Sequence, residues 1–222
     1  MNPLPYIWEL IKNHSDKPSM MRAVAEVWQE GSREYALIGE AYDDSYIGHS
    51  RQWRHSGEKY FSHVLAVAVI IFLYLGIKDA DLIIAALLHD LVEDQPDAWT
   101  IKKIRQKYGE KVAILVNAVT KPSRKRLKMN RERYDKLVTA NVKRGGVLAI
   151  ILKAADRLHN MLTLWGTPEK KWEYVSETTL YILPLAHKVG LLWKELYLAI
   201  AEQLQSIHIN DNEPSVVGQG HE

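Results

Sequence analysis

Cysteine is absent from all 222 residues of the sequence. Without it the chain has no disulfide scaffold, no zinc site with thiolate ligands and no cysteine nucleophile. The first residues also lack the positively charged and then apolar pattern of a secretory leader. We therefore expect a protein of a reducing, cytoplasmic compartment.

A large excess of either charge is also missing. Lys and Arg number 29, Asp and Glu number 27, and the formal net charge is +2. This balance excludes the broad positive surface that holds a protein on nucleic acid, and any site for a polyanion is expected to be local. The most apolar run, residues 64–77, would span about 21 Å as a helix, short of the ~30 Å hydrocarbon core of a membrane. We predict neither a nucleic-acid nor a membrane partner, and the sequence leaves the oligomeric state open.

Long stretches of alternating β-branched residues are missing as well. Apolar residues instead recur every three or four positions through most of the chain, which predicts an all-α fold. We expect a single-domain bundle of roughly ten helices within residues 1–206. The predicted helices cover residues 5–13, 18–30, 59–75, 79–94, 98–108, 110–121, 130–143, 146–164, 168–188 and 190–206. Residues 31–56, rich in Gly, Asp, Ser and Tyr, are expected to form a loop that could lie over a pocket, and residues 207–222 a disordered tail.

The most informative segment chemically is His89-Asp90-Leu91-Val92-Glu93-Asp94, which closes an apolar helix. On a continuous helix, one imidazole and three carboxylates would gather at the end of a buried element. A divalent cation would compensate this charge while using the same nitrogen and oxygen atoms as ligands. The alternative is a helix end whose acidic side chains simply face water, and a His-Asp pair alone does not exclude it.

Two other apolar helices carry polar residues that need an explanation. His63 begins the apolar run Val64–Ala68, where a lone histidine is more often a satisfied core residue than a metal ligand. Asp156, Asn160 and Thr163 fall on one helix face at i, i+4 and i+7. A buried Asp156 needs a partner, whereas Asn160 and Thr163 are neutral hydrogen-bonding groups suited to holding a substrate.

Together these segments resemble a known family. The order His63, His89-Asp90, Asp156 resembles the H…HD…D signature of HD-domain metal phosphohydrolases, and the surrounding residues resemble the hydrolase domain of RelA/SpoT homologues, which include the small alarmone hydrolases. The motifs R-x-S-G-E-x-Y-x-x-H, A-L-L-H-D-x-V-E-D, V-T-K, K-x-A-D-R-L-H-N-M and E-T-x-x-x-x-x-P-L-A-x-x-x-G occur at residues 54–63, 86–94, 119–121, 153–161 and 177–190. Five motifs in one order are far more specific than any one of them.

The resemblance implies an HD-type helical fold and a role for each matching residue. His63, His89, Asp90 and Asp156 would bind one divalent ion, Mn²⁺ in this family, and Glu93 and Asp94 would handle the water and its proton. The substrate would contact Arg54, His55, Ser56, Lys121, Asn160 and Thr163, with the stretch Arg124-Lys125-Arg126 placed to meet phosphate. Two imidazoles and two carboxylates leave coordination positions open for water and a phosphate oxygen, which suits this chemistry. Basic residues on a helix usually form a solvated face, so the basic stretch alone is not specific.

The implied activity is a Mn²⁺-dependent 3′-pyrophosphohydrolase that cleaves guanosine tetra- and pentaphosphate, (p)ppGpp, to GDP or GTP and pyrophosphate. Only one more helix and the tail are expected after Gly190, which implies the stand-alone type of hydrolase.

Three residues depart from the family pattern: Val64 replaces a proline, His55 a lysine and Leu162 an arginine. The changes at His55 and Leu162 keep open a related HD hydrolase of another nucleotide, such as an adenosine alarmone or NADPH as a 2′-phosphate substrate. A second alternative is a nucleotide-binding partner that has lost turnover. The six intact metal and acid–base positions argue against that alternative.

Overall fold

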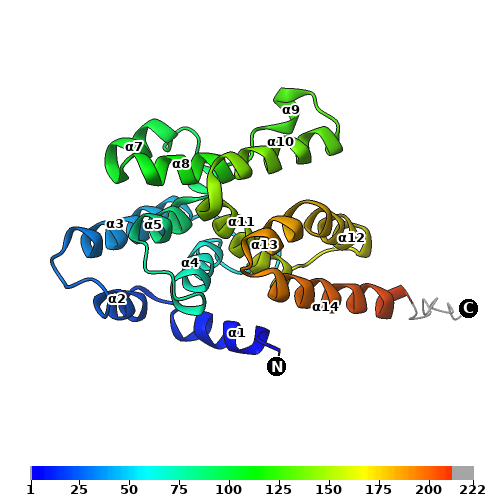
Figure 1. Cartoon of the computed structure of the whole chain (residues 1–222), viewed down its shortest axis with the longest axis horizontal. Coiled ribbons are helices and arrows are strands. Elements are labelled where there is room, and N and C mark those ends of the chain that lie inside the picture. Colours follow the sequence, from blue (N-terminus) through cyan, green and yellow to red (C-terminus); the bar gives the residue numbers. More distant parts are fainter. Residues whose placement is uncertain (1, 212–222) are drawn as a thin grey trace, which may run out of the picture.

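The chain folds into helices joined by short turns (Figure 1). The computed structural model describes residues 2–211, with the backbone alone at residues 125 and 208–211. The helices are α1 (Leu4–Asn13), α2 (Lys17–Ala25), α3 (Arg33–Gly48), α4 (Phe61–Val69), α5 (Ala80–Leu88), α6 (Leu91–Asp94), α7 (Ile101–Tyr108), α8 (Glu110–Val119), α9 (Arg124–Leu127), α10 (Arg131–Arg144), α11 (Gly146–Leu162), α12 (Pro168–Glu177), α13 (Leu183–Val189) and α14 (Trp193–Asp211), with the π-helical segments η1 (Ile70–Tyr74) and η2 (Thr178–Ile182). Residues 2–211 contain no strand, and an isolated antiparallel bridge joins Trp53 to Lys59. The all-α prediction is confirmed.

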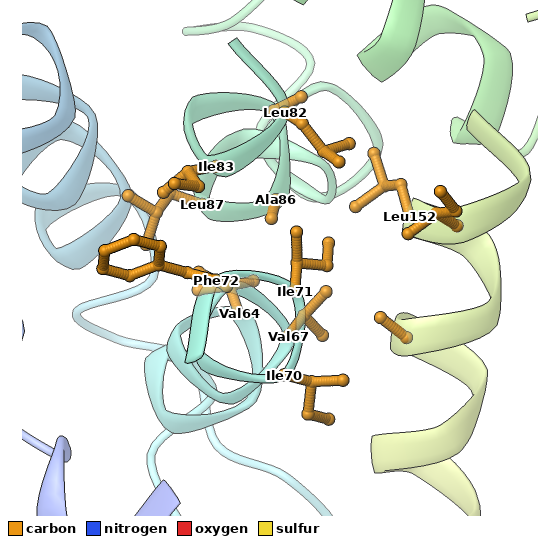
Figure 2. Close-up of a cluster of buried hydrophobic side chains, with 14 of the residues drawn as sticks. Val64, Val67, Ile70, Ile71, Phe72, Leu82, Ile83, Ala86, Leu87 and Leu152 are labelled. Atoms are coloured by element: carbon orange, nitrogen blue, oxygen red, sulfur yellow. The ribbon is translucent and has the colours of Figure 1, made fainter. Parts of the chain in front are cut away.

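The core is centred on α4, η1, α5 and α11, whose inward positions are apolar. Figure 2 shows side chains of α4 and η1 facing those of α5, with Leu152 of α11 alongside. Val67, Ile71, Leu82 and Leu152 are fully buried. Burying one such side chain contributes about 1.5–3 kcal/mol, so these contacts fix the three long helices relative to one another. Among the helices of residues 2–211, none is long and apolar enough to cross a membrane.

Helix α11 runs through the middle of the molecule (Figure 1). It contacts α8 and α10 on one side and α13 and α14 on the other, and it also packs on α4 and α5. A polar side chain on α11 therefore lies close to groups from several distant parts of the sequence.

The expected loop at residues 31–56 is wrong in its first part, because residues 33–48 form α3. Ser32 caps this helix by accepting a hydrogen bond from the Tyr35 N–H, and Ile38 and Tyr42 are buried. The acidic residues that made the segment look like a loop lie on the outer face. There Asp44 accepts hydrogen bonds from Lys107 and Tyr108.

Four other predicted helices differ from the structure: the helix expected at 18–30 ends at Ala25, the helix expected at 59–75 passes from α4 into η1, and two more are interrupted. The helix expected at 79–94 ends at Leu88, and α6 begins at Leu91. Leu91 continues the apolar repeat of α5, which hides the break in the sequence. The helix expected at 168–188 passes through η2 before α13, where Pro184 lacks the N–H that a continuous α-helix needs. The tail predicted for residues 207–222 lies mostly outside the described residues, and α14 reaches Asp211.

Candidate metal centre and substrate cavity

Three packed helices bring the four predicted metal ligands together. His63 lies near the start of α4, His89 directly follows α5, Asp90 is the next residue, and Asp156 lies within α11. The two imidazoles are 1% and 2% exposed, and Asp156 is 6% exposed. Because the apolar contacts between these helices are tight, the positions of the polar groups are set by the core itself.

The four side chains point at a common centre. His63 Nε2 lies 3.3 Å from Asp156 Oδ1 and 3.7 Å from Asp90 Oδ2. His89 Nε2 lies 3.1 Å from Asp90 Oδ2 and 3.9 Å from Asp156 Oδ1. One ligand atom from each of His63, His89 and Asp90 lies within 4.8 Å of the others. Asp156 is not in this compact group of three, but its Oδ1 approaches both imidazoles and offers a fourth donor beside it.

His89 shows that these donors suit a metal ion. Its Nδ1 lies 2.8 Å from the Ala86 carbonyl oxygen, which only accepts, so Nδ1 carries a proton and Nε2 is the nitrogen that can turn a lone pair to a cation. That Nε2 is buried and makes no hydrogen bond, although Asp90 Oδ2 lies 3.1 Å away. A divalent cation would satisfy this buried nitrogen and neutralise both carboxylates.

The two carboxylates are held by Asn160 and by two further side chains, Tyr60 and Lys153, to which the sequence analysis gave no role. Lys153 Nζ donates to Asp156 Oδ2 at 2.7 Å, and Asn160 donates to Asp156 Oδ1 at 2.6 Å. Tyr60 donates to Asp90 Oδ2 at 2.8 Å. Tyr60 and Lys153 both lie inside the motifs quoted above. For Lys153, the signal available in the sequence was a charged residue within an otherwise apolar helix.

The charges of the cluster shift its pKa values in opposite directions. Burial lowers the pKa of His89, but Asp90 and Asp156 raise it by more, to about 9. Burial holds the pKa of His63 below its ordinary value. Burial also opposes ionisation of Asp156, yet Lys153 and the imidazoles hold the pKa of that carboxyl well below its usual range. The metal-free cluster therefore contains ionised carboxylates that Lys153 and the His89 imidazolium balance.

The predicted acid–base pair lies on α6, beside this cluster. Asp94 Oδ2 accepts a hydrogen bond from Gln52 Nε2 at 2.9 Å and lies 3.9 Å from His49 Nδ1. Burial and the neighbouring Asp90 raise the pKa of Asp94. Glu93 Oε2 accepts from the Lys121 N–H at 3.0 Å. Gln52 and His49 belong to the segment expected as a loop, and for this reason the sequence analysis missed them.

A cavity of 710 Å³ lies next to the cluster, and the predicted substrate-binding residues line it. These are Arg54, His55, Ser56, Lys121, Asn160 and Thr163, together with Arg124 from the basic stretch. The guanidinium of Arg54 donates to Asn160 Oδ1 and to Thr163 Oγ1, each at 2.9 Å. Tyr60 and Asn160 also line the cavity and hydrogen-bond the carboxylates of the cluster, so they join the two regions.

The cavity has further walls that no sequence motif indicated. Trp53, Trp165, Tyr134, Lys170 and Tyr174 line it. The ring of Trp165 stacks almost parallel to that of His55, with 6.5 Å between ring centroids and 13° between planes. The sequence offered only scattered tryptophans, and which of them face a cavity depends on how the loops fold.

A model of the family described as "HD domain" matches residues 41–192. The chain therefore belongs to the HD-domain family. Within that family, 156 residues are 40% identical to the "Guanosine-3′,5′-bis(diphosphate) 3′-pyrophosphohydrolase" of Aquifex aeolicus, covering 69% of this chain and 22% of that protein. Over 160 residues the chain is also 36% identical to the "Bifunctional (p)ppGpp synthase/hydrolase SpoT" of Escherichia coli, covering 69% of this chain and 22% of that protein. The resemblance to RelA/SpoT homologues is confirmed, and the chain spans about a fifth of the length of these relatives.

A solved structure shares the fold. It is described as "A metazoan ortholog of SpoT hydrolyzes ppGpp and plays a role in starvation responses", and it superposes with a TM-score of 0.65 at 23% sequence identity. The match covers 76% of this chain and 96% of the other. At this identity the likeness supports the fold alone.

Proposed function

We propose that the chain is a Mn²⁺-dependent guanosine-3′,5′-bis(diphosphate) 3′-pyrophosphohydrolase, which converts (p)ppGpp to GDP or GTP and pyrophosphate. The observation that carries the proposal is the buried His-Asp cluster beside a cavity lined by cations and aromatic rings. A polyphosphorylated nucleoside has the matching chemistry, because its phosphates suit the cations and its base suits the rings. The names of the relatives support the same substrate.

In this proposal His63, His89, Asp90 and Asp156 hold the ion. Nitrogen and carboxylate donors without thiolate suit Mn²⁺. When bound, the ion supplies Lewis-acid chemistry, lowering the pKa of water and neutralising charge at phosphorus. Tyr60 and Lys153 keep the two carboxylates oriented through their hydrogen bonds to Asp90 and Asp156.

Asp94 and Glu93 move the protons of the reaction. Water attacks the phosphorus joined to the 3′-oxygen, the P–O3′ bond breaks, and the 3′-oxygen takes a proton as pyrophosphate forms. A raised pKa lets Asp94 accept the proton of the water and hold it for transfer. Gln52 keeps the Asp94 carboxylate oriented, and the Lys121 N–H does the same for Glu93.

The cavity fixes the nucleotide so that the attack is in line. Arg54, already paired with Asn160 and Thr163, presents a rigid polar wall to the nucleoside, and Ser56 and His55 lie beside it. Lys121 and Arg124 supply positive charge for the phosphates. A cytoplasmic setting and a function without nucleic acid or membrane belong to this proposal, since its substrate is a small nucleotide.

The experiment is pyrophosphate release from guanosine tetraphosphate by the purified chain with Mn²⁺. Parallel reactions contain EDTA or the Asp90→Ala variant, whose helical circular dichroism should match the unaltered chain. We expect release that both controls abolish. Release that persists in Asp90→Ala contradicts the metal assignment.

A substrate panel separates the proposal from its two alternatives. The His55–Trp165 stack stands where the family pattern has a lysine, and it keeps an adenine nucleotide in contention. Preferred cleavage of adenosine alarmones, or phosphate release from NADPH, would replace the guanine assignment. Tight binding of (p)ppGpp by calorimetry without any product would instead indicate a binding partner.

A further inference from the structure

A buried histidine outside the proposed ligand set contacts a residue of the candidate metal centre. His159 of α11 is 3% exposed, and its Nδ1 lies 2.8 Å from Nδ1 of His63. The ring centroids are 5.0 Å apart, and Trp8 of α1 packs against the other side of His159 at 6.2 Å. His159 lies in a recognised motif, but neither the proposed ligand set nor the proposed substrate contacts use it.

A hydrogen bond between two neutral imidazoles has two possible directions. When His63 Nδ1 donates to His159 Nδ1, the lone pair of His63 Nε2 faces the centre. When His159 Nδ1 donates instead, the proton of His63 sits on Nε2, directed at Asp156 Oδ1 3.3 Å away. Only the first direction leaves His63 able to bind a cation.

The comparison with His89 shows what is special about this pair. His89 Nδ1 faces the carbonyl oxygen of Ala86, and a carbonyl can only accept, so its tautomer is fixed by the backbone. The partner of His63 can both donate and accept. The ability of His63 to act as a ligand therefore depends on which nitrogen of His159 carries the proton.

We propose that His159 is a positioning residue that accepts the Nδ1 proton of His63 and so directs the lone pair of His63 Nε2 at the metal. His159 then carries its own proton on Nε2. Its backbone is fixed in α11, where the His159 carbonyl accepts hydrogen bonds from both the N–H and the hydroxyl of Thr163. The inference rests on the metal centre of the proposed function and is independent of the identity of the nucleotide.

The test is a matched pair of variants, His159→Asn and His159→Leu. Asn and Leu have nearly the same size, so both remove similar packing, but only Asn keeps an acceptor near the position of Nδ1. Mn²⁺ affinity is measured by calorimetry without nucleotide, with the metal-free melting temperature as a control for folding. We expect His159→Leu to weaken Mn²⁺ binding roughly 10- to 100-fold and His159→Asn to stay within about threefold of the unaltered chain. Equal affinity in His159→Leu and the unaltered chain, or equal loss in both folded variants, overturns the proposal.

A second measurement decides the matter even where His159→Leu does not fold. Long-range ¹H–¹⁵N NMR of the unaltered chain loaded with Zn²⁺ reports which nitrogen of His159 is protonated. The proposal requires the Nε2–H tautomer, and a proton on Nδ1 overturns it. A chain that binds Mn²⁺ but cleaves no alarmone contradicts the proposed function alone, whereas active protein with normal affinity in His159→Leu contradicts this inference alone.

Discussion

The His-Asp cluster and the rim of the substrate cavity are built in different ways. The cluster projects from packed helices, and its imidazoles are 1% and 2% exposed. The rim comes largely from connecting segments, where Trp53 is 59% and Trp165 66% exposed. Many packing contacts fix the positions of the side chains in the cluster, whereas only a few contacts hold those of the rim. The centre is therefore suited to precise chemistry and the rim to changes in recognition, which explains why the family departure at His55, a residue of the cavity wall, leaves the cluster intact.

Asp94→Asn should give the largest effect. It tests whether proton transfer and metal binding belong to different residues of the centre. The amide cannot carry the proton, so we expect kcat to fall by roughly 10²- to 10⁴-fold. Mn²⁺ affinity should stay within about threefold, because Asp94 is not among the proposed ligands. Calorimetry beside steady-state kinetics checks both values, and a parallel loss of metal binding would show that Asp94 is itself a ligand.

Lys153→Met should reveal how much the buried centre depends on charge balance. Lys153 and Asp156 form a buried ion pair at 2.7 Å. Removing one partner leaves a buried charge, so the free energy of unfolding without metal should fall by about 3 kcal/mol.

The exposed pair Lys136–Glu132 supplies the matched control. Lys136→Met should cost less than about 0.5 kcal/mol in the same urea titration. Saturating Mn²⁺ should restore part of the stability of Lys153→Met, because the ion replaces the lost charge. Equal losses in the two variants would contradict the difference between buried and exposed charges.

A pH titration of stability gives a smaller effect from the same centre. The folded pKa of His89, about 9, exceeds its ordinary value of 6.5. Its contribution is complete below pH 6.5 and is lost as pH rises through 9. The metal-free chain should lose roughly 2–3 kcal/mol across this window.

Urea unfolding in EDTA between pH 6.5 and 9.5 measures this loss. His63 and His159, whose pKa values burial lowers, are neutral in both the folded and the unfolded state only above about pH 7.5, so the slope due to His89 is read above that pH. His89→Gln should flatten the profile. If the free energy of unfolding still falls with pH in His89→Gln, another group binds the proton.

Lys121→Ala and Lys170→Ala should give the smallest effects, since they alter the rim. Each removes one cation from the cavity wall, and we expect KM to rise about three- to tenfold with kcat unchanged. The difference should shrink at high salt, because exposed charges are screened. A fall in kcat without a change in KM would move these lysines from recognition to the reaction.

The centre was predictable from the sequence for a physical reason. A histidine or aspartate inside an apolar helix is costly unless it has a partner, so His63 and Asp156 were conspicuous against their neighbours. The same reasoning locates them in space, because apolar helices of this length must pack together. Helix α3 was harder to predict, since its acidic residues are stabilised by tertiary partners such as Lys17 and Lys107.

The aromatic part of the rim, Trp53 and Trp165, escaped prediction because it depends on the paths of loops. The position of Trp165 follows from how the segment between α11 and α12 turns, and a periodic pattern carries no information about that turn. Likewise, the break between α5 and α6 spans only His89 and Asp90, so the apolar repeat continues across it. A periodic pattern of apolar residues therefore says least about short breaks in a helix, such as this one at two functional residues.

Helix α11 carries residues of both the His-Asp cluster and the substrate cavity. Lys153, Asp156 and His159 serve the centre, while Asn160 and Thr163 belong to the cavity. Inserting or deleting one residue ahead of Lys153 would rotate all five by about 100° relative to their partners. Gene variants with such a frame-preserving change would lose metal binding and substrate binding together. The length of α11 is therefore constrained by both regions at once.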